Sequence, residues 1–130
     1  MGTIFSKIIN GEISSYKILE DEKFYSFLDI NPMAKGHVLV VLKKETDYLF
    51  DIDDDTLSEM MLFSKRIAVA LKQAVSCKRV GVMVLGMEVP HAHIHLIPIQ
   101  KESDMNLSNP RLKLTTEEFS NIAEDIKNKL

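Results

Sequence analysis

Apolar residues recur at helical spacing in three segments of the chain, which predicts three amphipathic helices. The first helix is short, and Thr3 can cap its start while Gly11 ends it in the left-handed conformation. The second is long and starts in the acidic stretch "DIDDDTLSEM", where Thr56 and Glu59 have the spacing of a capping box. The apolar faces expected for these two helices are Ile4, Phe5, Ile8 and Ile9, and Leu57, Met60, Met61, Ser64, Ile67, Ala68, Leu71 and Val75.

The third helix is expected in the C-terminal stretch "TTEEFSNIAEDIKNKL". Thr115 and Glu118 have capping-box spacing at its start. One side of this helix is apolar, so it must dock, either on a dimer partner or at the edge of a binding pocket. The residues of that side are Phe119, Ile122, Ala123 and Ile126.

Runs of β-branched and aromatic residues predict five strands between the helices. Two lie in "YKILEDEKFYSFLDI", around a polar turn at Glu20 to Lys23, and read as a hairpin. "HVLVVLK" and "RVGVMVLG" are apolar throughout, which is typical of buried strands, and "HAHIHLIPI" is the fifth. Short connections favour an α+β fold: an antiparallel five-stranded sheet packed with the long helix and the short N-terminal helix, plus an extra C-terminal helix.

Composition narrows the class of protein. The chain has 130 residues, 45% hydrophobic and 27% charged, which fits one globular domain over residues 1–130. Sixteen basic and 19 acidic residues are spread along the chain, so no nucleic-acid polymer is expected as a partner. Cys77 is the only cysteine, which excludes an intramolecular disulfide and favours a reducing, cytoplasmic location. No signal peptide is recognisable, and no membrane partner is expected.

Three of the four histidines stand at alternate positions in "HAHIHLIPI". On a strand, His91, His93 and His95 would share one face, and the apolar residues between them would take the other. Neighbouring histidines would be roughly 6.7 Å apart along the backbone. A single zinc ion therefore cannot easily bind all three.

Three uses of these histidines remain open. A metal ion could take two of them, with His37 or Glu88 as a further ligand. All three could instead be exposed on an edge strand. In the third use, imidazoles donate to phosphate oxygens while one attacks phosphorus, because a pKa of roughly 6.5 permits both roles near neutral pH. The central His93 is then the natural nucleophile.

Residues 91–97 match the signature of the histidine triad (HIT) family: His, apolar, His, apolar, His, apolar, apolar. "TIFSKIINGEI" and "FLDINPMAKGHVLVVLKKE" resemble the Hint-like branch of that family in the same order, so the resemblance covers about residues 3–99. It implies a nucleotide hydrolase or transferase that acts on the α-phosphate of purine nucleotides. The substrates implied are of the phosphoramidate type, and no cofactor is implied.

The resemblance also implies a role for each site residue. His93 would form a nucleotidyl-histidine intermediate that water resolves. His91 and His95 would position the phosphate and tune His93, and His37 would complete the site. Asp29 would accept the ribose hydroxyl groups. The residues implied for an apolar base pocket are Phe5, Ile8, Phe27, Leu28 and Ile30.

Family members are commonly homodimers that join their sheets across an interface, and the long helix and "RVGVMVLG" would suit such a dimer. Some relatives bind zinc through cysteines near the N-terminus. This chain has Ser6 and no cysteine there, so no metal is expected.

Two segments depart from the Hint-like pattern. That branch usually carries an Asn and a Gly-rich stretch ending in Gln and a small hydroxyl residue before the triad, whereas this chain has the shorter "VLGMEVPH". Glu88, near the hydroxyl residue's place, would repel phosphate if ionised and inward-facing. The extension over about residues 100–130 also lacks the Hint-like tail. Two alternatives to a phosphoramidase therefore stand: a catalytically weak nucleotide-binding module or scaffold, and a metal protein built on the HxHxH strand.

Overall fold

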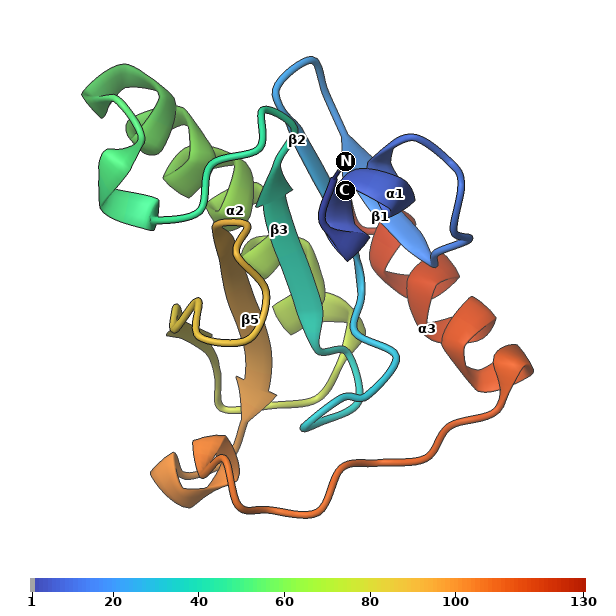
Figure 1. Ribbon diagram of the computed structural model, residues 1–130. Helices are drawn as coiled ribbons and strands as arrows, with labels where there is room; N and C mark the ends of the chain where they lie inside the picture. Colours follow the sequence, from blue (N-terminus) through green and yellow to red (C-terminus); the bar gives the residue numbers. More distant parts are fainter. Residues whose placement is uncertain (1) are drawn as a thin grey trace.

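A computed structural model describes residues 2–130 as a five-stranded antiparallel sheet with helices on both faces (Figure 1). The strand order is β1-β2-β3-β5-β4, and every neighbouring pair is antiparallel. The predicted α+β class is therefore confirmed. The strands are β1 (Lys17–Glu20), β2 (Phe24–Leu28), β3 (Val38–Leu42), β4 (Arg79–Met83) and β5 (His93–Ile99). The helices are α1 (Ile4–Ile9), α2 (Asp54–Ala74) and α3 (Thr116–Lys127), with 3-10 turns η1 (Leu49–Asp51) and η2 (Glu102–Met105).

Different helices cover the two faces of the sheet (Figure 1). On one face α2 and α3 bury a large apolar cluster, and on the other α1 places Phe5 and Ile8 against side chains of β2 and β3. Successive residues of β3 serve the two clusters in turn: Val40 packs toward α2, while Leu39 and Val41 pack toward α1. The expectation that this strand is buried throughout is confirmed.

α1 has the predicted ends. The Thr3 side chain accepts the Ser6 N–H at the N-cap, and Gly11 has φ of 81° just beyond the last turn. Only glycine adopts that conformation without a steric cost. Ile4, placed by its spacing on the apolar face, is half-exposed.

α2 begins before the expected cap. Asp53 is the N-cap, and its carboxylate accepts the N–H of Thr56 at 3.1 Å. Thr56 therefore lies inside the first turn, and the predicted Thr56–Glu59 capping box is wrong. An aspartate at this position is favoured because it also faces the positive end of the helix dipole. Met61 is another correction: it is exposed, and Phe63 is buried instead.

β4 is an edge strand, so the prediction of a buried strand at "RVGVMVLG" is wrong. It pairs only with β5, and Val82 is half-exposed. The apolar sequence led to a wrong prediction here because a partly buried edge strand can contain as many valines as a fully buried strand. Gly81 leaves room for Met105 of η2, since a Cβ at that position would collide with the Met105 sulfur.

α3 docks on the core of its own chain rather than at the pocket edge. Its four predicted apolar residues are all buried in the cluster that α2 covers. The ring of Phe119 stacks on Tyr16 with 4.9 Å between centroids. The predicted Thr115–Glu118 capping box is confirmed. Within residues 2–130, no helix is long and apolar enough to cross a membrane.

The turn before β3 brings two distant side chains together. Gly36 has φ of 90°, and a Cβ there would lie 2.9 Å from Val75 Cγ2, so this tight position requires glycine. The Asp29 N–H donates to the His37 carbonyl at 2.9 Å, which closes the loop between β2 and β3. Asp29 and His37 are thereby held beside each other.

Candidate active site

The three alternating histidines lie on the α1 face of the sheet, as their spacing predicted. The residues between them, Ala92 and Ile94, belong to the cluster on the α2 face. β5 begins only at His93, so His91 precedes the strand rather than opening it. It is nevertheless held in line with the sheet, because the Ala92 N–H donates to the Thr46 carbonyl at 2.6 Å.

His93 is fixed by a hydrogen bond to the backbone. Its Nδ1 lies 2.7 Å from the carbonyl oxygen of His91. A carbonyl can only accept, so Nδ1 carries the proton and, in the neutral ring, Nε2 keeps a free lone pair. The Phe5 ring meets the imidazole edge-on at 4.9 Å between centroids and holds its plane. This is the tautomer that a nucleophilic Nε2 requires.

His91 is fully buried, and protein groups use both of its ring nitrogens. Nε2 donates to the carbonyl of Leu42 at 2.6 Å, and Nδ1 lies 2.7 Å from the Thr3 hydroxyl. Its ring cannot reach a phosphate. The expectation that His91 positions the phosphate is therefore corrected, whereas its expected influence on His93 agrees with the bond from His93 Nδ1 to the His91 carbonyl.

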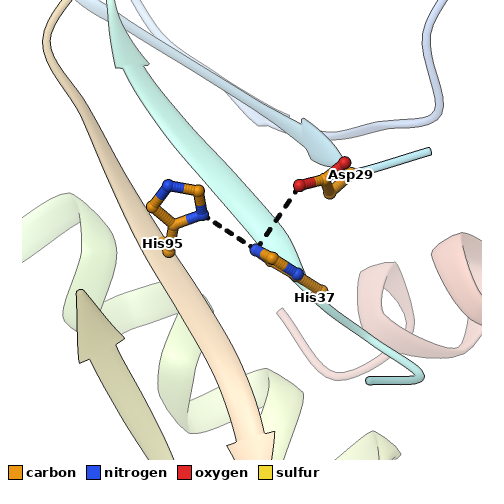
Figure 2. Close-up of side chains that lie close together, drawn as sticks. All are labelled: Asp29, His37 and His95. Carbon is orange, nitrogen blue, oxygen red and sulfur yellow. Dashed lines mark hydrogen bonds and ion pairs between the residues drawn. The ribbon is translucent and has the colours of Figure 1, made fainter. Parts of the chain in front are cut away.

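His37, His95 and Asp29 form a second hydrogen-bonded group (Figure 2). The Met33 N–H donates to His37 Nδ1 at 3.0 Å, so the His37 proton is on Nε2 and points to His95 Nδ1 at 2.9 Å. An oxygen of Asp29 lies 3.6 Å from the same Nε2. By elimination, the proton of His95 sits on its own Nε2, where it is available as a donor.

The residues implied for a base pocket are only partly brought together. Phe5, Ile8 and Phe27 are buried in one cluster on the α1 face, beside the histidines. Leu28 points to the opposite face into the α2 core, because consecutive strand residues alternate, so its expected place in the pocket is corrected. Ile30 is 73% exposed and belongs to neither apolar cluster.

Comparisons with known proteins identify the family of the chain. The model of the HIT domain matches residues 10–102. The chain belongs to the HIT family. A protein of Borreliella burgdorferi named "Uncharacterized HIT-like protein" is 36% identical over 95% of this chain and 94% of its own length. The "Adenosine 5'-monophosphoramidase HNT1" of Saccharomyces cerevisiae is 41% identical over 76% of this chain and 63% of its own.

A solved structure agrees over nearly the whole HIT chain. A Hit-like protein from Bartonella henselae superposes with a TM-score of 0.84 at 33% identity, covering 98% of this chain and 96% of its own. The likeness therefore includes the C-terminal segment that follows the family domain.

Three histidines of this HIT protein, His37, His93 and His95, have a lowered pKa. Burial, reinforced by the neighbouring His95, lowers the pKa of His37 to about 3. Burial and the nearby His93 lower the pKa of His95 to about 4. Burial also lowers the pKa of His93, against the upward effect of its bond to the His91 carbonyl. At neutral pH the lone pair of His93 is thus available to attack.

One group among residues 2–130 has the donors to hold a metal ion. One ligand atom each of Asp29, His37 and His95 lie within 4.8 Å of one another. An incoming zinc ion would have to displace the proton shared by the two imidazoles, since both nitrogens already face each other across it. The site expected from the sequence used two histidines of the HxHxH strand with His37 or Glu88. The group in the structure has only one histidine of that strand, His95, with His37 and Asp29.

Arg111 is a charged neighbour that the sequence did not indicate. Its positive charge contributes to the lowered pKa of both His37 and His95, after burial and one neighbouring histidine in each case. The segment is tied to the site by the Leu112 N–H, which donates to the Pro32 carbonyl at 2.9 Å. Nothing in the spacing of Arg111 along the chain signals this, because the link depends on how the C-terminal segment folds back.

Glu88 brings negative charge near the histidines. Its side chain is exposed and helps to line a cavity of about 430 Å³ with Thr3, Glu45 and Pro90. The pKa of Asp29 is raised mainly by burial, and the charge of Glu88 raises it further. The same charge opposes the burial that lowers the pKa of His93. The charge of Glu88 therefore acts on both Asp29 and His93, although neither residue lines that cavity.

The buried neutral histidines predict that acid destabilises the protein. Unfolded histidine has a pKa of roughly 6.5, well above the folded values, so below that pH the unfolded chain binds protons that the folded chain does not. The free energy of unfolding should fall as the pH drops from about 6.5 toward 4. His37→Asn should reduce this slope by about 1.4 kcal/mol per pH unit, as expected for one proton.

Urea denaturation at several pH values measures the slope. Ile67→Val, which removes one buried methylene from the core, is the control and should lower stability without changing the slope. An unchanged slope in His37→Asn would contradict a neutral, buried His37.

Proposed function

We propose that this HIT protein hydrolyses nucleoside phosphoramidates, with His93 as the nucleophile. The observation that carries the proposal is the 2.7 Å hydrogen bond from His93 Nδ1 to the His91 carbonyl, which leaves Nε2 of the neutral ring unprotonated. The name of the yeast relative, an adenosine 5'-monophosphoramidase, supports the choice of substrate.

The nucleotide would lie across the α1 face of the sheet. The base packs against the apolar side chains of Phe5, Ile8 and Phe27, with Ile30 at the rim. The ribose hydroxyl groups reach the carboxylate of Asp29, which also accepts the Asn31 N–H at 2.8 Å and so is held in place. This order would bring the α-phosphate next to His93.

The reaction would proceed in two displacements. First, Nε2 of His93 bonds to the α-phosphorus and the phosphorus–nitrogen bond to the leaving amine breaks; the amine takes a proton from solvent. Next, water bonds to phosphorus, the bond to His93 breaks, and the water's proton returns to solvent. The Nε2–H of His95 donates to a phosphate oxygen in both steps and stabilises its charge.

We expect His93→Ala to abolish release of nucleotide from adenosine phosphoramidate and to leave nucleotide binding within a few-fold, because the ring supplies the nucleophile rather than the base pocket. Product detection by chromatography measures turnover, and calorimetry with AMP measures binding. Mass spectrometry of the quenched unmodified protein should find one adenylyl group on His93. Unchanged turnover in the variant would rule out this role.

A second candidate function follows from Glu88. Its exposed carboxylate, which acts on the pKa of His93 and Asp29, favours a nucleotide-binding module with weak turnover. Such a module would bind nucleotide without forming an adduct or product.

Glu88→Gln separates the two candidates. The amide keeps the shape of the side chain and removes its charge, so KM for an anionic nucleotide should fall several-fold in low salt, and the effect should shrink as salt screens the charge. Glu12→Gln removes an equal charge from the exposed turn after α1 and serves as the control. If KM changes equally in both variants, Glu88 has no local effect on the phosphate.

We also propose that the protein forms a homodimer through the free edge of β4. This edge lacks a partner strand within residues 2–130, and exposed apolar side chains flank it. They are Val82, Leu85 and Met87.

A further inference from the structure

The two helices that begin at a threonine cap, α1 and α3, use carboxylates from different parts of the chain. At α3, Thr115 and Glu118 cap each other: Glu118 N–H donates to the Thr115 hydroxyl at 3.1 Å, and Thr115 N–H donates to the Glu118 carboxylate at 3.0 Å. At α1, the residue in the position of Glu118 is Ser6, which cannot supply a carboxylate. The Thr3 N–H donates instead to Glu45, at 3.1 Å, in the segment after β3.

Glu45 therefore completes the capping box of α1 from 42 residues away in sequence. Its Oε1 also accepts the hydroxyl proton of Ser6 at 2.7 Å. That bond, with the Thr3 N–H, lowers the pKa of Glu45 and keeps the carboxylate ionised. The start of α1 is thus fastened to the chain at the end of β3.

The hydroxyl protons of this cluster can be assigned one by one. Ser6 gives its hydroxyl proton to Glu45, and the Thr3 oxygen accepts the Ser6 N–H at 3.2 Å. The hydroxyl proton of Thr3 is then free to go to His91 Nδ1 at 2.7 Å. In the neutral ring, His91 Nδ1 is the acceptor, because its Nε2–H donates to the Leu42 carbonyl.

His91 is consequently held on all sides. Its ring is fixed between Thr3 and Leu42, its N–H donates to the Val89 carbonyl at 2.8 Å, and the next N–H donates to Thr46, the neighbour of Glu45. The carbonyl left at the centre of these anchors is the one that accepts the proton of His93.

We infer that Thr3, Ser6 and Glu45 are positioning residues for the nucleophile: they hold His91 in one tautomer and one place, so that its carbonyl orients His93. None of the three contacts the reacting atoms. The catalytic consequence rests on the proposed function, whereas the tautomer of His91 does not.

Three variants test the inference. Thr3→Val keeps the volume of the side chain but removes the hydroxyl, so His91 Nδ1 loses its donor, and Thr3→Ser keeps the hydroxyl. Thr115→Val removes the equivalent cap from α3, away from the site. It is the control for the stability that Thr3→Val loses with the cap of α1. For each, we would measure kcat and KM with adenosine phosphoramidate, the free energy of unfolding, and the imidazole nitrogen NMR signals of His91.

Thr3→Val should lower kcat roughly tenfold or more with KM changed less than twofold, because a misplaced nucleophile slows the chemical step rather than binding. The His91 nitrogen signals should shift in this variant. Thr3→Ser should restore both, and Thr115→Val should lose stability while keeping kcat and the His91 signals.

Two results would overturn the inference: unchanged His91 signals in Thr3→Val, or a loss of kcat no greater than in Thr115→Val. If the unmodified protein shows no turnover at all, the proposed function fails. The His91 signals then still decide whether Thr3 fixes the tautomer.

Discussion

The hydrogen bond between His93 Nδ1 and the carbonyl oxygen of His91 decides which nitrogen of His93 faces the site. Imidazole has two nitrogens, and only the one without a proton can attack. The bond therefore turns a common side chain into a directed nucleophile. The buried surroundings support it, because burial lowers the pKa of His93 and keeps the ring neutral.

The rest of the fold holds the two partners of that bond. β5 carries His93 between β3 and β4 in the sheet, and α1 closes the face above it with Phe5. The loop from β2 to β3, tightened at Gly36, sets Asp29 and His37 beside His95. These hydrogen bonds leave the lone pair of His93 on Nε2 and the proton of His95 on its own Nε2. The site therefore presents a nucleophile and a hydrogen-bond donor without reorganisation.

Much of this could be predicted from the sequence, because periodicity reports local structure. The alternation of His91, His93 and His95 correctly predicted one shared face. The spacing of Thr115 and Glu118 correctly predicted the capping box of α3. Burial was harder to predict than local structure. A valine-rich sequence such as that of β4 occurs in edge strands and in central strands, and only the strand order shows that β4 lies at the edge. The position of Leu28 was predicted wrongly because neighbouring residues of a strand point to opposite faces, so Leu28 cannot share the face of Phe27.

Long-range contacts lie beyond sequence patterns. Glu45 caps a helix far from it along the chain, and the charge of Arg111 acts on His37 and His95 only because the C-terminal segment returns past Pro32. His91 is a second example of a role that depends on long-range contacts. Its place in the motif implied that it positions the phosphate, but its two ring nitrogens are hydrogen-bonded to Leu42 and Thr3.

The tautomer of His93 in the unmodified protein tests the account most directly. Nitrogen NMR of the imidazole rings at neutral pH should find His93 with its proton on Nδ1 and none on Nε2. A proton on Nε2 with Nδ1 bare would contradict the account, because the bond to the His91 carbonyl would be absent and the nucleophile would point into the backbone.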